Sequence, residues 1–334
     1  MATIGDTKVT LLDRSKGFDP DGSEAAVVEL LNQHNPLLDY LHFEEGNLPT
    51  GHRISQRTGL PAAYYRKMNK GVPSSKATSA QIDETAGELV ARSEIDKSIA
   101  ELNGNTAEYR TKEARPFIEG MNVEFMRNFF YGNTFQNGET IHGLATRFNT
   151  VNVANAANAV NVIDAGGTGS DNTSIWLLGL APHTVYGIYP KGSKAGIEIH
   201  RGSGDEWIMD RDGGKYRGYI DEYKWQNGLA LEDWRYVVRI ANIDVSDLKP
   251  DLSTGADIAD LMAQALEQIE SLAGVTPVFV MGRRVRGMLR RQMVKRTTNS
   301  TLSIDTIAGK RVTHFDEVPV LRSDAILETE ARVV

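Results

Sequence analysis

Residues 107–131 read AEYRTKEARPFIEGMNVEFMRNFFY, the longest strongly periodic stretch of the chain. Asn105 or Thr106 can cap the start of a helix here, and Gly132 can end it. Pro116 lies inside the run, so the helix either kinks there or begins its regular part near that residue. The apolar positions recur at helical spacing and are Ala114, Phe117, Ile118, Met121, Phe125 and Phe129. The stretch therefore predicts one amphipathic helix, about 37 Å long at the standard rise per residue.

After this helix the sequence changes to short β-rich runs that alternate with helical patterns. Turn residues at 212–214 indicate a hairpin inside a β-meander over residues 205–242. The predicted elements are strands at 175–178, 185–189, 216–225, 228–231, 236–240 and 277–281, a strand pair at 310–321, and helices from Ser253 or Thr254 to Gly274 and at 283–296. This order predicts an α+β fold in which a mixed sheet is flanked by helices.

Before the helix, residues 52–83 have few large aliphatic side chains and two prolines. The ends of this segment have β-tolerant composition without a buried stripe, which predicts a long two-stranded loop with little core of its own. Such a loop gains stability by lying on another surface. Its basic residues are the candidates for contacts with that surface: Arg53, Arg57, Arg66, Lys67, Lys70 and Lys76.

Composition excludes several classes of protein. The 334 residues contain no cysteine, which excludes disulfide frameworks, thiolate catalysis and cysteine-ligated metals. The net charge of −7 argues against a protein that coats nucleic acid through its overall field. No signal peptide and no stretch of about 18 apolar residues are found, so we expect no membrane partner.

The motifs that carry chemistry are incomplete. The glycines at 166–169 lack the following Lys-Ser or Lys-Thr of a phosphate-binding loop, and Ser203 near His200 lacks a nucleophile elbow. The run 210–214 resembles half a calcium loop but misses the later glutamate, and no two histidines lie three or four residues apart. We therefore expect no catalytic residues, no metal site and no cofactor.

The predicted helix 283–296 carries the strongest local charge bias of the chain, with no acidic residue. We favour a solvated face, or one paired with acidic residues of a neighbour, over nucleic-acid contact, because no aromatic residues are interleaved for base stacking. The candidate subunit or DNA contacts on this helix are Arg283, Arg284, Arg286, Arg290 and Arg291.

The order of arm, two-stranded loop, long helix and mixed lobe resembles the major capsid proteins of tailed bacteriophages with the Hong Kong 97-type fold. Several stretches resemble the short-tailed (podovirus-like) subset of that family. They are residues 46–52, 57–61, 130–133, 163–176, 189–196, 233–243 and 318–326.

The resemblance implies a domain organisation. Residues 1–35 would form an N-terminal arm and 50–85 an extended loop that lies over a neighbouring subunit. A peripheral domain would combine 36–49, 86–142 and 205–245, with residues 107–131 as its spine helix. An axial domain would combine 143–204 and 246–334.

The resemblance also implies the function: a virion subunit, without enzymatic activity, that self-assembles as pentamers and hexamers into an icosahedral shell around double-stranded DNA, in the cytoplasm of a host bacterium. No coiled coil precedes the arm, so a separate scaffolding protein is implied, with a portal and a cement protein as further candidate partners. Some relatives cross-link a lysine of the extended loop, for which Lys67, Lys70 and Lys76 would be candidates; plain salt bridges are the favoured alternative.

Two other functions stay open on the sequence alone. An encapsulin-like nanocompartment would use the same fold to hold an enzyme cargo. A cytosolic hydrolase unrelated to capsids could be built on the helix–sheet lobe.

Overall fold

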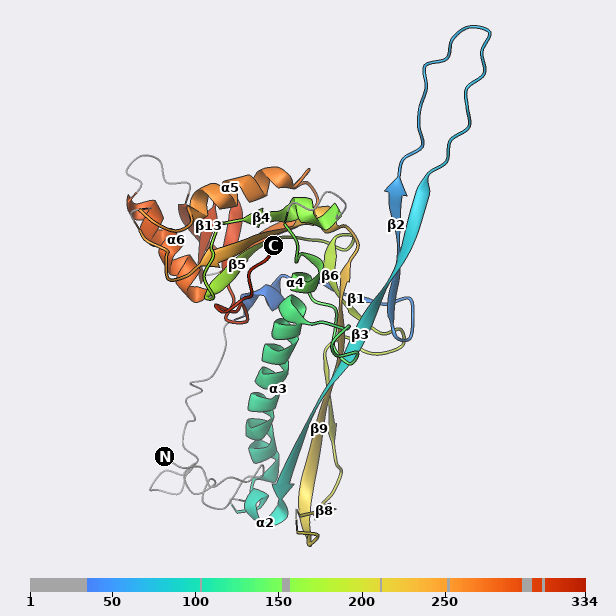
Figure 1. Cartoon of the computed structure of the whole chain (residues 1–334). Helices are drawn as coiled ribbons and strands as arrows, with labels where there is room; N and C mark the ends of the chain where they lie inside the picture. The colour runs from blue at the N-terminus through green and yellow to red at the C-terminus, as the bar shows by residue number, and fades with distance from the viewer. Residues whose placement is uncertain are drawn as a thin grey trace. The chain divides into compact units, whose positions relative to one another are not determined.

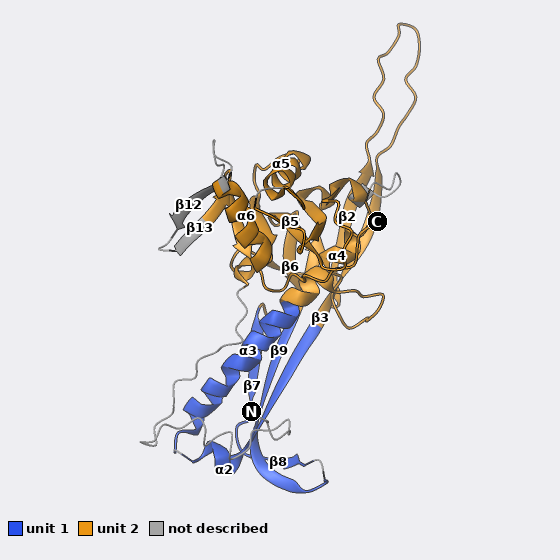
Figure 2. Cartoon of the chain, turned by 60° about the vertical axis from the view of Figure 1, so that its left-hand side comes forward, with its two compact units in different colours: residues 1–33, 88–125, 196–226 blue, residues 34–87, 126–195, 227–334 orange. Residues whose placement is uncertain are grey.

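The computed structural model describes residues 35–334 except for 103, 152–156, 211, 251–252, 296–301 and 308–309. The predicted arm, residues 1–35, therefore lies almost entirely outside the described residues. The described chain is α+β and divides into two compact units (Figure 2). Within the described chain, unit 1 comprises residues 88–125 and 196–226, and unit 2 comprises 35–87, 126–195 and 227–334.

The predicted amphipathic helix is confirmed as α3, Thr106–Tyr131. It continues through Pro116, so its regular part does not begin there. Within unit 1 the apolar face of α3 packs against the strand β9 (Lys215–Leu231): the ring of Phe117 stacks on that of Tyr223, with centroids 5.4 Å apart. The ring of Phe125 lies 4.7 Å from that of Trp225.

Pro116 provides a test of helix strain, because a proline inside a helix cannot donate to the carbonyl four residues earlier. Pro116→Ala is expected to raise the free energy of unfolding by up to about 3 kcal/mol, the difference between the two residues in a helix interior. The side chain is exposed, so the change removes no packing. Urea unfolding followed by circular dichroism measures the effect, with Arg115→Ala at the exposed neighbouring position as control. A less stable Pro116→Ala variant would contradict the expectation.

Unit 1 is built on the long strand β9, which pairs antiparallel with β7 (Ile197–Arg201) and β8 (Glu206–Met209). The separate strands predicted at 216–225 and 228–231 are one strand, because the ladder continues without a turn. The end of β3 (Thr78–Asp96) leads into the short helix α2 (Lys97–Ala100), capped by the side chain of Asp96. A small core of Ile95, Ala100 and Tyr109 is buried there.

Unit 2 contains a mixed sheet whose strand order is β12, β13, β14, β11, β5, β6 and the end of β9, with β10 paired to both β4 and β5. The continuous apolar runs of β5 and β10 are buried, as expected for strands covered on both faces. The bounds are β4 Val162–Asp164, β5 Asn172–Leu180, β6 Val185–Tyr189, β10 Val237–Asp244, β11 Thr276–Met281, β12 Leu302–Ile307, β13 Lys310–Phe315 and β14 Val318–Arg322.

Two helices supply the core on this sheet, α5 (Ile258–Gln268) and α6 (Arg283–Lys295). Their buried residues Met262, Ala265, Val285 and Leu289 belong to one apolar cluster with side chains of the sheet. The remaining short elements of unit 2 are η1 Pro36–Asp39, β1 Phe43–Glu45, α4 Leu144–Arg147, η2 Ala157–Asn161 and η3 Trp234–Tyr236. The predicted mixed sheet flanked by helices is thus confirmed.

The bounds predicted for the first of these helices were wrong. The helix α5 does not begin at Ser253 or Thr254, because the side chain of Asp257 accepts the N–H of Asp260 and caps the start. It also ends before Gly274, since the backbone leaves the helical region at Ile269.

The predicted two-stranded loop is confirmed. The strand β2 (Gly51–Gly59) pairs antiparallel with the first part of β3, from Gly51 opposite Thr85 to Gly59 opposite Thr78. Both strands and the segment 60–77 that joins them project beyond the sheet of unit 2 (Figure 1). The loop therefore has no apolar layer of its own at its outer end.

The compact units have other boundaries than the expected peripheral and axial domains. Residues 36–49, 126–142 and 227–245 fall in unit 2, and residues 196–204 fall in unit 1. The reason is clearest for 237–244, where β10 is buried and paired with β5 at the centre of the sheet of unit 2. Residues 36–49 join the same unit because β1 pairs with β6.

Candidate assembly surfaces and buried ion pairs

The outer part of the extended loop is exposed along its whole length, residues 60–77. Large apolar side chains are among the exposed ones: Leu60 is 81% exposed, Met68 is 94% exposed, and Tyr65 is fully exposed. The predicted contact residues Arg66, Lys67, Lys70 and Lys76 share this surface. Because apolar side chains gain by leaving water, this segment has the composition of a contact surface.

Arg53 has a partner inside its own hairpin. Its guanidinium forms a bidentate pair with the carboxylate of Asp83 on β3, at 2.6 and 2.7 Å. The hydrogen bond from Arg53 lowers the pKa of Asp83. Both side chains are exposed, and a pair of this kind contributes little to stability. The guanidinium of Arg53 is therefore already paired within its own hairpin.

The side chains of Arg57 and Arg66 make fewer contacts within the described chain than that of Arg53. Arg57 lies beside a groove of about 710 Å³ that separates the end of β2 from the segment 232–235 of unit 2. The only hydrogen bond found for the Arg66 side chain goes to the backbone oxygen of Lys70, at 3.3 Å, within the described part of the loop. Both guanidinium groups are thus available to a partner.

The basic helix α6 is paired within unit 2. Arg283 lies 3.3 Å from Asp324, and Arg284 lies 3.2 Å from Glu328. Arg286 and Arg290 both donate to the hydroxyl of Thr313. Burial lowers the pKa of Arg286, and the neighbouring charges of Arg290 and Arg322 add to this shift.

The fifth candidate on this helix, Arg291, is exposed. The acidic partners of Arg283 and Arg284 come from the C-terminal segment, about forty residues away in the sequence. The sequence favoured a solvated face or acidic residues of a neighbour, whereas the structure pairs Arg283 and Arg284 with acidic residues of the same chain. A subunit or DNA contact of this helix stays a prediction.

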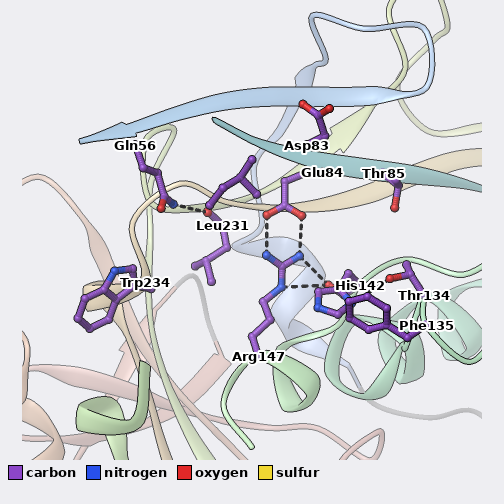
Figure 3. Close-up of a pocket in the computed structure, with 11 residues that line it drawn as sticks. Gln56, Asp83, Glu84, Thr85, Thr134, Phe135, His142, Arg147, Leu231 and Trp234 are labelled. Atoms are coloured by element: carbon purple, nitrogen blue, oxygen red, sulfur yellow. Dashed lines mark hydrogen bonds and ion pairs between the residues drawn. The ribbon is translucent and has the colours of Figure 1, made fainter. Parts of the chain in front are cut away.

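A bidentate ion pair fixes the root of the extended loop (Figure 3). Arg147 from α4 donates to both carboxylate oxygens of Glu84 on β3, at 2.5 and 2.6 Å, and to the backbone oxygen of His142 at 2.9 Å. Glu84 is 4% exposed, so the pair is desolvated. It borders a cavity of about 410 Å³ that Gln56, Phe135 and His142 also line.

His142 responds to this environment. Its Nδ1 lies 3.1 Å from the hydroxyl of Thr134, and the ring of Phe135 meets it edge-on. Burial lowers the pKa of His142, and the nearby charge of Arg147 adds to this shift. The lowered pKa favours the neutral imidazole of His142 at neutral pH.

A second buried network connects the C-terminal segment to the sheet of unit 2. Arg239 on β10 donates to Glu330 at 2.7 Å, to the hydroxyl of Ser174 at 3.0 Å, and to the backbone oxygen of Phe148 at 2.7 Å. Glu330 also accepts hydrogen bonds from Ser174 and from Tyr131. Burial raises the pKa of Tyr131 well above its ordinary value, and the charge of Glu330 adds to this shift.

Unit 1 has a comparable pair, in which Arg110 on α3 donates to both carboxylate oxygens of the buried Asp221 on β9. None of these three ion pairs was predicted from the sequence. Their partners are 63, 91 and 111 residues apart, so no local spacing links them. The one usable signal was an arginine within the apolar run of β10, because a charge inside a buried strand requires a partner.

The described residues contain no helix that could cross a membrane and no convergent group of three metal-binding side chains. A long helix, a mixed sheet flanked by helices and a projecting two-stranded loop define the class of Hong Kong 97-type shell proteins.

Comparison with known proteins identifies the family. A family model described as major capsid protein GP7 matches residues 19–334, and the chain belongs to that family. A chain in the structure of bacteriophage epsilon15 is 30% identical, with a TM-score of 0.77 over 100% of this chain and 99% of that chain. The capsid of bacteriophage JBD30 is 10% identical, with a TM-score of 0.53 over 89% and 93% of the two chains. No curated protein matches the sequence.

The chain is thus a structural subunit of a phage virion, a major capsid protein that assembles into the icosahedral shell. These matches favour the function of a phage shell protein over that of an encapsulin-like nanocompartment or a cytosolic hydrolase. An encapsulin from Synechococcus elongatus is 12% identical, with a TM-score of 0.42 over 66% of this chain and 92% of that chain, a similarity too low to bear on function.

Proposed function

We propose that the extended loop, residues 50–85, is the element that binds a neighbouring subunit in the shell. The observation that carries this proposal is the exposed tip at 60–77, where Leu60, Tyr65 and Met68 lie in water on a segment with no core of its own. A second copy of the chain offers the surface that would cover these side chains, and such contacts close into rings and then into a shell.

The positive charge of the extended loop also supports a second copy of the chain as its binding partner. Residues 53–76 contain six basic residues and no acidic one, whereas the chain as a whole has a net charge of −7. The rest of the chain is therefore acidic, and a second copy attracts the loop. Arg53 is already paired with Asp83, so Arg57, Arg66, Lys67, Lys70 and Lys76 are the residues we assign to the contact.

Reversing the charge at two of these positions tests the proposal. Arg57→Glu with Arg66→Glu is expected to reduce the yield of assembled particles at least tenfold, because opposite charges steer association and like charges oppose it. The monomer should keep its fold, since neither guanidinium is buried in the described chain. Sedimentation and negative-stain microscopy of protein co-expressed with the scaffold measure the yield, and circular dichroism checks the fold.

Lys191→Glu with Lys194→Glu is the matched control, because both lysines are exposed in unit 2 and lie outside the loop residues 50–85. It changes the net charge by the same amount and should leave the yield close to that of the wild type. An unchanged yield for the loop variant would reject the proposed contact.

We further propose that the subunit acts without enzymatic activity and encloses double-stranded DNA without reading its sequence. The pairing of Arg283 and Arg284 with acidic residues supports this, since paired arginines offer little free charge to phosphate. Assembly would take place in the host cytoplasm with a separate scaffolding protein and a portal, and a cement protein would be a further partner. Co-expression with the scaffold tests this: regular closed particles are expected only when both proteins are present.

A further inference from the structure

The glycine-rich segment at 165–170 passes over one end of the strand pair β5 and β10 in unit 2. Asn172, the first residue of β5, is paired directly with Asp244, the last residue of β10. Side chains that face each other across an antiparallel ladder project from the same side of the sheet. Asp171 precedes Asn172, so three oxygen-bearing side chains come together at this end of the strands.

Two of these side chains are carboxylates that share a donor. The backbone N–H of Ser246 lies 3.0 Å from Oδ1 of Asp244 and 3.0 Å from Oδ2 of Asp171. Asp244 Oδ1 also accepts from the hydroxyl of Ser246 at 2.8 Å and from the N–H of Asp247 at 3.2 Å. One oxygen of each carboxylate is thus used to hold the loop.

The other two oxygens converge beside Gly169. A Cβ atom placed on this glycine would lie 2.3 Å from Oδ2 of Asp244 and 3.0 Å from Oδ1 of Asp171. Asp244 is only 8% exposed, and no basic side chain pairs with either carboxylate within the described ranges. These two carboxylate oxygens therefore lie beside the same glycine without a basic partner, and a cation placed there would neutralise their charge.

Asn172 supplies an independent sign of a missing ligand. Its Nδ2 donates to the backbone oxygen of Gly169 at 2.7 Å, which turns its Oδ1 toward Gly167. The residue is 1% exposed, and this Oδ1 has no hydrogen-bond partner. An unsatisfied buried acceptor is costly, and it lies on the same face as the carboxylate of Asp244.

We propose that Asp171, Asp244 and Asn172 bind a calcium ion beneath the loop 167–169. Calcium takes six to eight oxygen ligands in flexible geometry, so two carboxylates and an amide oxygen leave positions for backbone oxygens and water. Magnesium demands a tighter octahedral arrangement and gives up its water reluctantly. The site would fasten the glycine-rich segment to the ends of β5 and β10.

Calcium titration of the full-length protein tests the proposal. After treatment with a chelator, the wild-type protein is expected to bind one calcium ion per chain by calorimetry and to unfold at a higher temperature with calcium than without. Asp171→Asn and Asp244→Asn should each weaken calcium binding at least tenfold and lose the temperature shift. In chelator, circular dichroism checks that each variant keeps the fold, because a neutral amide accepts more weakly from Ser246 and Asp247 than the Asp244 carboxylate does.

Asp316→Asn serves as the control, since Asp316 is an exposed acid in the turn after β13 and should leave binding unchanged. A wild-type protein that does not respond to calcium would overturn the site, as would an Asp244→Asn variant that binds calcium as the wild type does. An equal response to magnesium would overturn the choice of ion. None of these measurements involves particles, so the result is separate from the assembly proposal.

Discussion

Replacing Glu330 by alanine is expected to lower the free energy of unfolding by about 3–5 kcal/mol, the cost of leaving one charge of a buried pair without its partner. The charge left behind is Arg239, which is 3% exposed on the central strand β10. The hydroxyls of Tyr131 and Ser174 lose an acceptor as well. Urea unfolding followed by tryptophan fluorescence measures the loss.

Two variants show whether the loss comes from the ion pair. Glu317→Ala removes an exposed carboxylate from the turn between β13 and β14 and should change stability by less than about 0.5 kcal/mol. Arg239→Met combined with Glu330→Met should be more stable than Glu330→Ala, because no unpaired charge stays buried. If Glu330→Ala unfolds within 1 kcal/mol of the wild type, the network does not have the assigned importance.

Replacing Arg147 by methionine is expected to have the second large effect, again about 3–5 kcal/mol, because the buried Glu84 would be left without its ionic partner. Glu84 belongs to β3 at the root of the extended loop, so the change should also loosen the loop relative to the sheet of unit 2. Compared with the wild type, hydrogen exchange should therefore accelerate more in residues 51–59 than in β10. Thermal unfolding should report the lost stability.

Conservative changes at the same pair separate charge from geometry. Arg147→Lys keeps the charge but cannot form the bidentate contact, so it should recover less than half of the loss. Glu84→Gln with Arg147→Met removes both charges and should be more stable than Arg147→Met alone. Equal exchange rates in the loop of Arg147→Met and of the wild type would contradict the anchoring role.

Much of the fold could be predicted from the sequence because it depends on local periodicity. The apolar positions from Ala114 to Phe129 predicted α3, and the basic helix was predicted at 283–296, where α6 spans Arg283–Lys295. The polar ends of the segment 52–83 predicted the hairpin of the extended loop. The bounds of α5 were missed because Ser253, Thr254 and Asp257 can all cap a helix, and only the folded chain shows which one does.

The candidate contact surface was predictable only in part. A basic segment without acidic residues is visible in the sequence, and the structure shows it exposed together with Leu60, Tyr65 and Met68. That Arg53 pairs with Asp83 across the hairpin was not predicted, because the partner depends on the register of two strands. The assignment of the other basic residues to a neighbouring subunit stays a prediction.

The sequence by itself determined the long helix α3, the basic helix α6 and most strands of the sheet of unit 2, because residues three or four apart on a helix, or two apart on a strand, share a face. Only the tertiary structure decided which charges meet. Arg239 needs Glu330, Arg147 needs Glu84, and Asp244 lies beside Asp171, and these partners come from distant parts of the chain. A buried charge must be neutralised within a few ångströms in space, and separation along the sequence carries no information about that distance.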